Sequence, residues 1–379
     1  MIRAIWGALC KRQAALLSLQ QHASLRALHV PRVVQAALST RVGGTPHDVV
    51  FSLGTLRLLR YRRTVPAQHA EPVLFCYALV NRPYILDLQP HKSVVERYLE
   101  QGFEVYLLDW GVPTYADRHL TLEDYVCRAL DRVVEVVLKA QDRERLHLVG
   151  YCMGGTLSAL YTALAPGRVQ TLTLLAAPID FSGRDALLHV WTDPKYFDVD
   201  ALIDAHGNCP ATFLQACFSS MKPVQNLLEK NISFFEQMAD SRFLANHFAM
   251  EHWVNDNIPV AGETFREFVK KLYQDNQLVR GKLRLGARRV DLGRICCPLL
   301  LLTATKDHLV NPASTHGIEP HVGTGQIERL QIDAGHVGLV VSSRAHQTLW
   351  PEATRWLAQR SSAAEKVTTA ASRGVRSAS

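Results

Sequence analysis

The chain changes from a strand-like to a helical pattern within the six residues 150–155, which read Gly-Tyr-Cys-Met-Gly-Gly. The preceding residues 146–149 are mostly apolar, as expected for a buried strand. A strand that turns sharply into a helix holds a strained backbone at the corner, so its neighbours must be small where other chain crosses close by. The glycines around Cys152 meet this need. The turn therefore predicts a strand inside a sheet, a helix on its face and a thiol at the corner.

Strands and helices alternate on both sides of this turn. We expect strands at residues 49–53, 55–61, 73–80, 104–108, 146–149, 171–175, 298–304 and 326–332, and helices at residues 93–101, 121–140, 156–165 and 344–359. Thr121, three residues before Asp124, is a helix-start signal, and Pro351 is expected at a break. This order predicts an α/β fold with a mostly parallel sheet and helices on both faces.

The alternation stops near Phe181 and resumes near Leu292. Aromatic and helical stretches lie between, at residues 211–218, 233–248 and 264–272. We predict a sheet domain made of residues 46–182 and 289–360, with residues 183–288 inserted into it as a helical cap.

The chain of 379 residues has a formal net charge of +7, and the charge is uneven. No acidic residue precedes Asp48, whereas six basic residues do. Residues 1–45 are therefore predicted as a basic arm, and residues 361–379 as a disordered tail. Three interpretations of the arm stay open: a solvated leader, a helix over residues 2–28 that touches a surface or a partner, and an organellar transit peptide.

Composition excludes several classes of protein. No apolar run approaches the ~20 residues of a transmembrane helix. The basic residues of the arm lack interleaved aromatic residues, which argues against nucleic-acid binding. The eight cysteines have no paired spacing, so neither a disulfide framework nor a metal site is expected. We expect a cytoplasmic protein.

The turn at Cys152 is similar to the nucleophile elbow of the α/β-hydrolase fold, with cysteine in place of serine. In that fold the acid follows a later strand and the histidine follows the last one. Asp307 follows residues 298–304, and His336 follows residues 326–332. We predict that Cys152 attacks, that His336 takes its proton and that Asp307 orients the imidazole or acts on a second substrate. The backbone N–H groups of Met153 and Val80 are the predicted oxyanion donors.

Several separated blocks resemble the polyhydroxyalkanoate synthases, in particular the class III catalytic subunits. Besides the elbow, these blocks are Tyr77-Ala78-Leu79-Val80-Asn81-Arg82-Pro83-Tyr84, Asp109-Trp110-Gly111, Met250-Glu251-His252-Trp253, Ala261-Gly262-Glu263-Thr264-Phe265-Arg266, Asp307-His308-Leu309-Val310 and Gly335-His336-Val337-Gly338. The resemblance covers about residues 42–357. The family commonly has Gln where this chain has Met153, but only the backbone of that residue is needed.

The resemblance implies a polymerase that joins (R)-3-hydroxyacyl units, chiefly 3-hydroxybutyrate, from coenzyme A thioesters into a polyester. Coenzyme A is then a substrate and no cofactor is expected. A second non-catalytic subunit, homodimers or hetero-oligomers, and attachment to polyester granules are also implied. Two rival hypotheses remain: a cysteine-dependent hydrolase of esters or lactones, and a non-catalytic scaffold on granules.

Overall fold

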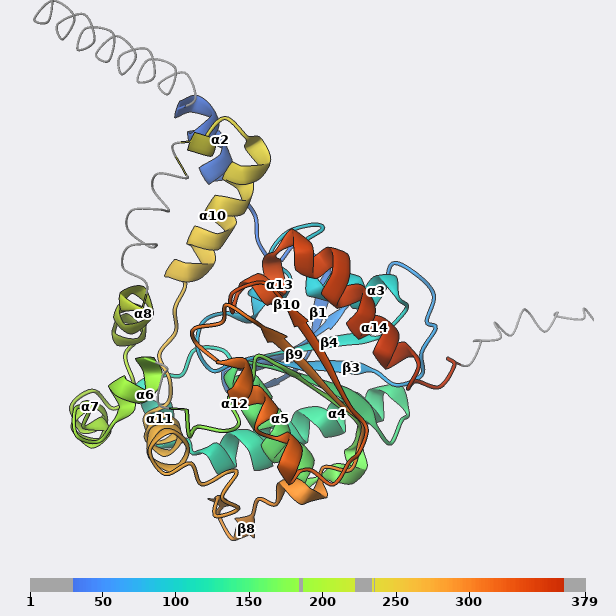
Figure 1. The fold of residues 1–379 in the computed structure, drawn as a ribbon. Helices are drawn as coiled ribbons and strands as arrows, with labels where there is room; N and C mark the ends of the chain where they lie inside the picture. Colours follow the sequence, from blue (N-terminus) through green and yellow to red (C-terminus); the bar gives the residue numbers. More distant parts are fainter. Residues whose placement is uncertain (1–29, 184–186, 222–233, 235, 365–379) are drawn as a thin grey trace, which may run out of the picture.

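The computed structural model describes residues 30–183, 187–221, 234 and 236–364. A sheet lies at the centre, helices cover both of its faces, and further helices extend to one side (Figure 1). The predictions for residues 1–29 of the basic arm and for the tail beyond residue 364 lie outside the described residues. The proposed division into arm, core, cap and tail stays a prediction.

Eight strands form the central sheet in the order β1-β2-β4-β3-β5-β6-β9-β10. The strands are β1 (His47–Leu53), β2 (Leu56–Tyr61), β3 (Val73–Cys76), β4 (Val105–Asp109), β5 (Leu146–Tyr151), β6 (Val169–Leu175), β9 (Leu299–Ala304) and β10 (Ile327–Ile332). Strand β2 pairs antiparallel with β1 and with β4, and the pairs from β4 onward are parallel. The predicted mostly parallel sheet is confirmed.

The central strands are apolar because helices cover both of their faces. Every residue of β5 and of β9 is buried. The covering helices are α3 (Val94–Glu100), α4 (Asp131–Gln141), α5 (Met153–Leu164), α12 (Pro312–His316), α13 (Gly338–Val341) and α14 (Trp350–Ala358). In Figure 1, α3 and α14 lie on one face of the sheet, and α4 and α5 lie on the other.

Local signals in the sequence set where several helices begin. The N–H of Thr121 donates to Asp124, and the N–H of Asp124 donates back to the Thr121 hydroxyl, so the predicted start is confirmed. The helix continues as π-helical turns, η3 (Asp124–Leu130), before it becomes α4. We expected a break near Pro351, but the helix continues through it. Leu349 and Trp350 keep right-handed helical backbone angles, and the π-helical segment η9 (Ala345–Leu349) passes directly into α14, where Pro351 lies in the first turn and needs no helical N–H partner.

Helices dominate the stretch predicted as a cap. They are α6 (Leu187–Thr192), α7 (Val199–His206), α8 (Ala211–Ser220), α10 (Ser241–Asn255), α11 (Gly262–Glu267) and the π-helical η6 (Phe268–Gln274). A small hairpin of β7 (Arg284–Leu285) and β8 (Arg288–Arg289), which the sequence pattern did not predict, follows them. Asn276 bonds to Asp180 and to the N–H of Phe181, so the chain returns next to the point where it left the sheet.

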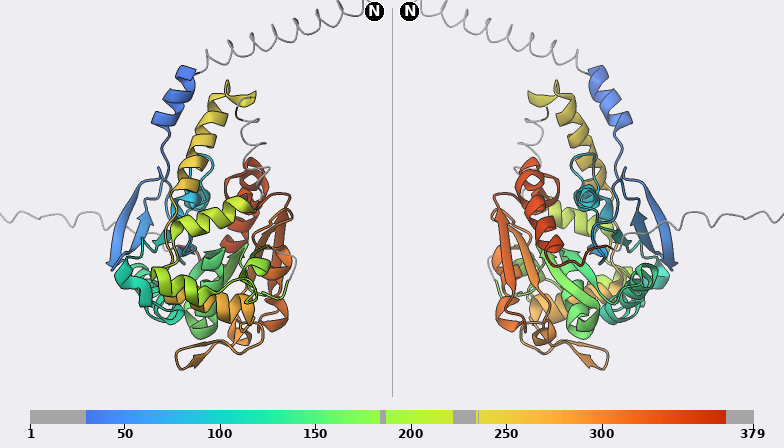
Figure 2. Two further views of the ribbon diagram at one scale, coloured as in Figure 1. Left: turned by 90° about the vertical axis from the view of Figure 1, so that its left-hand side faces the viewer. Right: turned by 90° about the vertical axis from the view of Figure 1, so that its right-hand side faces the viewer.

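Helix α2 (Val30–Ser39) projects from the same side as α10 and contacts it (Figure 2). None of its residues is buried. Within the residues that the structure describes, no helix has the length and apolarity needed to cross a membrane.

One predicted strand is too long. We expected a strand over residues 73–80, but β3 ends at Cys76. The indole N–H of Trp110 donates to the Tyr77 carbonyl at 2.8 Å, which removes that carbonyl from the sheet ladder. The chain then bends, and Asn81 adopts a left-handed conformation with φ of 63°. Val80 therefore lies four residues beyond the end of the strand.

Candidate active site

Cys152 stands at the corner between β5 and α5, in a strained backbone conformation with φ 54° and ψ −128°. Such a conformation costs a non-glycine residue about 1–3 kcal/mol and persists only where the surroundings enforce it. The surroundings here are tight. A Cβ on Gly154 would lie 2.2 Å from the Cys76 carbonyl oxygen, and one on Gly155 would lie 2.4 Å from the Ala177 Cβ. The predicted need for small residues at the turn is confirmed.

The N-terminus of α5 begins directly after the thiol. Cys152 donates its N–H to the Leu175 carbonyl at 2.9 Å, which ties the corner to β6. The Met153 N–H has no acceptor among the hydrogen bonds of the described residues. The first N–H groups of a helix carry a partial positive charge and can hold an anion. Met153 thus has the free donor that an oxyanion needs.

Asp307 and His336 are brought together from loops that follow β9 and β10. His336 Nδ1 lies 2.7 Å from Asp307 Oδ2. The other carboxylate oxygen, Oδ1, accepts the N–H groups of Leu309 and Val310 at 2.9 and 2.8 Å. The Asp307 side chain is only 1% exposed. Both oxygens are therefore occupied, and the carboxylate faces the imidazole rather than solvent.

His336 has a raised pKa because of its two neighbours. Burial alone would lower its pKa, but the charges of Asp307 and Cys152, together with hydrogen bonds to both, raise the pKa to about 10. Asp307 occupies Nδ1 of His336, so only Nε2 is left to interact with Cys152. The structure thus brings the three predicted residues Cys152, His336 and Asp307 into one interacting group.

Tyr151 was missed as a site residue by sequence reasoning. Its ring stacks on the imidazole of His336, with centroids 5.1 Å apart and an interplanar angle of 22°. Its hydroxyl donates to the His336 carbonyl at 3.3 Å. Tyr151 directly precedes the nucleophile, and this position is the signal that could have revealed it.

The predicted oxyanion donor Val80 lies on the segment after β3. This segment begins beside the elbow, because Gly154 packs against the carbonyls of Cys76 and Tyr77. The second donor is thereby expected from residues close to the thiol, and its assignment to Val80 stays a prediction.

Burial makes other cysteines less acidic. It raises the pKa of Cys76 and of Cys297 to about 12, and it also raises the pKa of Cys209 and of Cys217. Thiols of this kind are poor nucleophiles at neutral pH.

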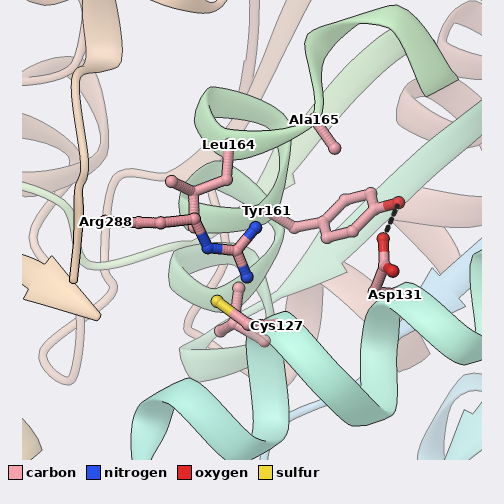
Figure 3. Close-up of a pocket in the computed structure, with 7 residues that line it drawn as sticks. Cys127, Asp131, Tyr161, Leu164, Ala165 and Arg288 are labelled. Atoms are coloured by element: carbon pink, nitrogen blue, oxygen red, sulfur yellow. Dashed lines mark hydrogen bonds between the residues drawn. The ribbon is translucent and has the colours of Figure 1, made fainter. Parts of the chain in front are cut away.

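A pocket lined by residues of η3, α4, α5 and the β7–β8 hairpin contains another thiol, Cys127, beside Arg288 (Figure 3). Burial raises the pKa of Cys127, and the nearby Arg288 charge only partly opposes this.

Within the described part of the chain, no group of three or more His, Cys, Asp or Glu side chains could hold a metal ion.

Family models match most of the chain. One described as the alpha/beta hydrolase fold matches residues 71–342, and one described as the Poly-beta-hydroxybutyrate polymerase (PhaC) N-terminus matches residues 21–99.

Relatives named poly(3-hydroxyalkanoate) polymerase subunit PhaC are similar over 84% of this chain. The Haloferax mediterranei protein is 44% identical, and the match covers 65% of its length. The proteins from Allochromatium vinosum and from a Synechocystis species are each 38% identical, with 90% and 86% of their lengths covered.

Solved structures support the fold alone. A monoacylglycerol lipase from Paleococcus ferrophilus superposes with a TM-score of 0.50 at 14% identity, covering 80% of this chain and 99% of the lipase. A putative lipase from Sulfolobus solfataricus gives a TM-score of 0.50 at 13% identity, covering 83% of this chain and 99% of that structure.

Proposed function

We propose a function from a premise that the comparisons establish: this chain belongs to the poly(3-hydroxyalkanoate) polymerase family, within the α/β-hydrolase superfamily. The proposed reaction transfers (R)-3-hydroxyacyl groups, chiefly 3-hydroxybutyryl, from coenzyme A thioesters to a growing polyester. One coenzyme A leaves for each acyl unit that is added. The thioester is a substrate, and no separate cofactor is proposed.

In the proposed first step, the Cys152 thiolate attacks the thioester carbonyl of the substrate. The carbonyl oxygen becomes an oxyanion that accepts the N–H of Met153 and, we propose, that of Val80. When the tetrahedral intermediate collapses, the bond to the coenzyme A sulfur breaks and the imidazolium of His336 gives its proton to that sulfur. The acyl group is then held as a new thioester on Cys152.

The second step uses an alcohol as the nucleophile. The hydroxyl of a 3-hydroxyacyl group attacks the Cys152 thioester, His336 takes the hydroxyl proton, and an ester bond forms as the Cys152 thiolate leaves. We propose that Asp307 acts through His336, since both of its carboxylate oxygens are already bonded. Water competes with the alcohol, so exclusion of water by the cap is part of the proposal.

The observation that supports this proposal most is a thiol at the elbow, next to a histidine whose pKa is raised to about 10 by the neighbouring Asp307 and Cys152. A thiolate–imidazolium pair suits exchange between thioesters because attacking and leaving groups have similar basicity. We further propose a class III enzyme that works with a second subunit, as a homodimer or hetero-oligomer, on polyester granules in the cytoplasm. The word "subunit" in the relatives' names supports a partner.

The test supplies (R)-3-hydroxybutyryl-coenzyme A to the full chain, with and without a candidate second subunit. The proposal expects coenzyme A release together with an insoluble polyester, and neither with Cys152→Ala. Free 3-hydroxybutyrate as the sole product would identify a hydrolase instead. Equal behaviour of the wild type and Cys152→Ala would point to a scaffold.

A further inference from the structure

The carboxyl end of cap helix α10 is bonded to the chain just after Val80. Asp256, the residue that follows α10, accepts from Arg82 Nε at 3.3 Å and from the Tyr84 hydroxyl at 3.0 Å. The indole N–H of Trp253 donates to the Arg82 carbonyl at 2.8 Å. We call these three contacts, among Arg82, Tyr84, Trp253 and Asp256, the α10 latch.

The latch joins parts of the chain that are far apart in sequence, since Arg82 and Asp256 are 174 positions apart. Trp253 is buried, whereas the side chains of Arg82 and Asp256 are 27% and 35% exposed. A partly exposed ion pair adds little to overall stability. The latch therefore matters less for overall stability than for the position of the segment that follows Val80.

The latched segment begins at a strained residue. Asn81 connects Val80 to Arg82 in a left-handed conformation, with φ of 63°. Its side-chain oxygen is buried and has no hydrogen-bond partner among the described residues, so this oxygen does not secure the turn. Strained backbone persists where neighbouring contacts enforce it. The contacts on Arg82 and Tyr84, just beyond the turn, supply that enforcement from the cap.

Val80 directly precedes this turn. If Arg82 and Tyr84 were released, Asn81 could relax toward an ordinary conformation, and the short segment that carries the Val80 N–H would lose its anchor. A displacement of about 1 Å at a catalytic contact can cost about 100-fold in rate.

We propose that Asp256 is a positioning residue for acyl transfer: from the docked cap helix it fixes the segment that carries the Val80 N–H. The oxyanion hole is then complete only while α10 is docked, which couples closure of the cap to catalysis. This inference rests on the proposed function and on Val80 as the second donor.

The same helix offers a matched control. Nearer its beginning, α10 contacts a different part of the core, where Gln89 Nε2 donates to the Ala245 carbonyl at 3.0 Å and Lys92 Nζ donates to Asn246 Oδ1 at 2.8 Å. Asn246→Ala therefore removes one contact between α10 and the core while leaving the contacts of Asp256 in place.

The test compares Asp256→Ala with Asn246→Ala in the full chain, by two reactions of Cys152. Acylation by (R)-3-hydroxybutyryl-coenzyme A, followed as the first burst of coenzyme A release, needs the oxyanion hole. Alkylation by iodoacetamide is a direct displacement that forms no oxyanion, so it reports only on the thiolate. We expect acylation to fall roughly 10- to 100-fold in Asp256→Ala and less than about 3-fold in Asn246→Ala, with alkylation little changed in both. Tyr84→Phe, which removes one hydroxyl, should lie between them.

Equal acylation rates in Asp256→Ala and Asn246→Ala would overturn the inference while leaving the proposed function standing. Parallel loss of acylation and alkylation in Asp256→Ala would overturn it too, because damage would then reach the thiolate itself. A wild-type chain that takes up no acyl group while its thiol alkylates normally would instead reject the proposed function, and the latch with it.

Discussion

Replacement of Asp307 by Asn separates two roles that its carboxylate could have. In the native site, Oδ1 accepts two backbone N–H groups and Oδ2 accepts from His336 Nδ1. An Asn side chain has only one oxygen, and the two backbone donors will hold it at the Oδ1 position. Its amide NH₂ must then face His336 Nδ1 as a donor. The imidazole is driven to the tautomer that carries its proton on the other nitrogen, so it can no longer accept the thiol proton.

Two effects add in this variant. The imidazole has the wrong tautomer, and the Asp307 charge that helps to raise the pKa of His336 is gone while the opposing burial remains. In serine-based triads the corresponding replacement lowers kcat by about 10⁴-fold. We expect a loss of about 10³- to 10⁴-fold in acylation of Cys152. If Asp307 instead acted directly on the substrate hydroxyl, acylation of Cys152 would keep its native rate, because that step involves no hydroxyl.

The assay measures three rates at neutral pH: alkylation of Cys152 by iodoacetamide, the first burst of coenzyme A release, and formation of polyester. Asp333→Asn is the matched control, because Asp333 bonds to Thr305 and Lys306 at the surface of the same two loops. If Asp307 acts through His336, all three rates fall together in Asp307→Asn and stay near the wild-type values in Asp333→Asn. Native rates of alkylation and burst with loss of polyester alone would refute the reasoning, since Asp307 would then act on the hydroxyl.

Two further predictions follow from the elbow and from the pKa of His336. Gly154→Ala places a methyl group 2.2 Å from a backbone oxygen, so the free energy of unfolding, measured with urea, should fall by about 1–3 kcal/mol. The matched change Gly167→Ala, at a position with no atom within 4 Å, should leave it nearly unchanged, and equal losses would contradict the steric argument. His336 has a pKa raised to about 10, so below about pH 6.5 its proton is bound in both folded and unfolded chains, and the stabilisation from its charge is complete. Between these values only the folded chain keeps the proton, so stability relative to His336→Gln should decline as pH rises toward 10. A difference that is flat or grows over this range would show that His336 is neutral in the folded chain.

The fold could be predicted because its signals are local. A buried strand and a start signal at Thr121 each depend on residues a few positions apart. The order of Cys152, Asp307 and His336 along the chain also carries information, because each follows a predicted strand and parallel strands end at one edge of a sheet.

Long-range contacts could not be predicted in the same way. The end of β3 at Cys76 depends on Trp110, which takes the Tyr77 carbonyl from 33 residues away. The latch depends on Asp256, whose partners precede it by more than 170 residues. Neither has a local pattern, since the residue types at these positions suit many surface loops equally well.

The central claim is that Cys152 carries the growing polyester as a thioester. Its most direct measurement is mass spectrometry of the peptide that contains Cys152, after acid quenching of a reaction with (R)-3-hydroxybutyryl-coenzyme A. We predict a series of masses that differ by one hydroxybutyryl unit, all on Cys152 and all removed by neutral hydroxylamine. Rapid release of coenzyme A with an unmodified Cys152 peptide, or with the acyl group on another residue, would contradict the account.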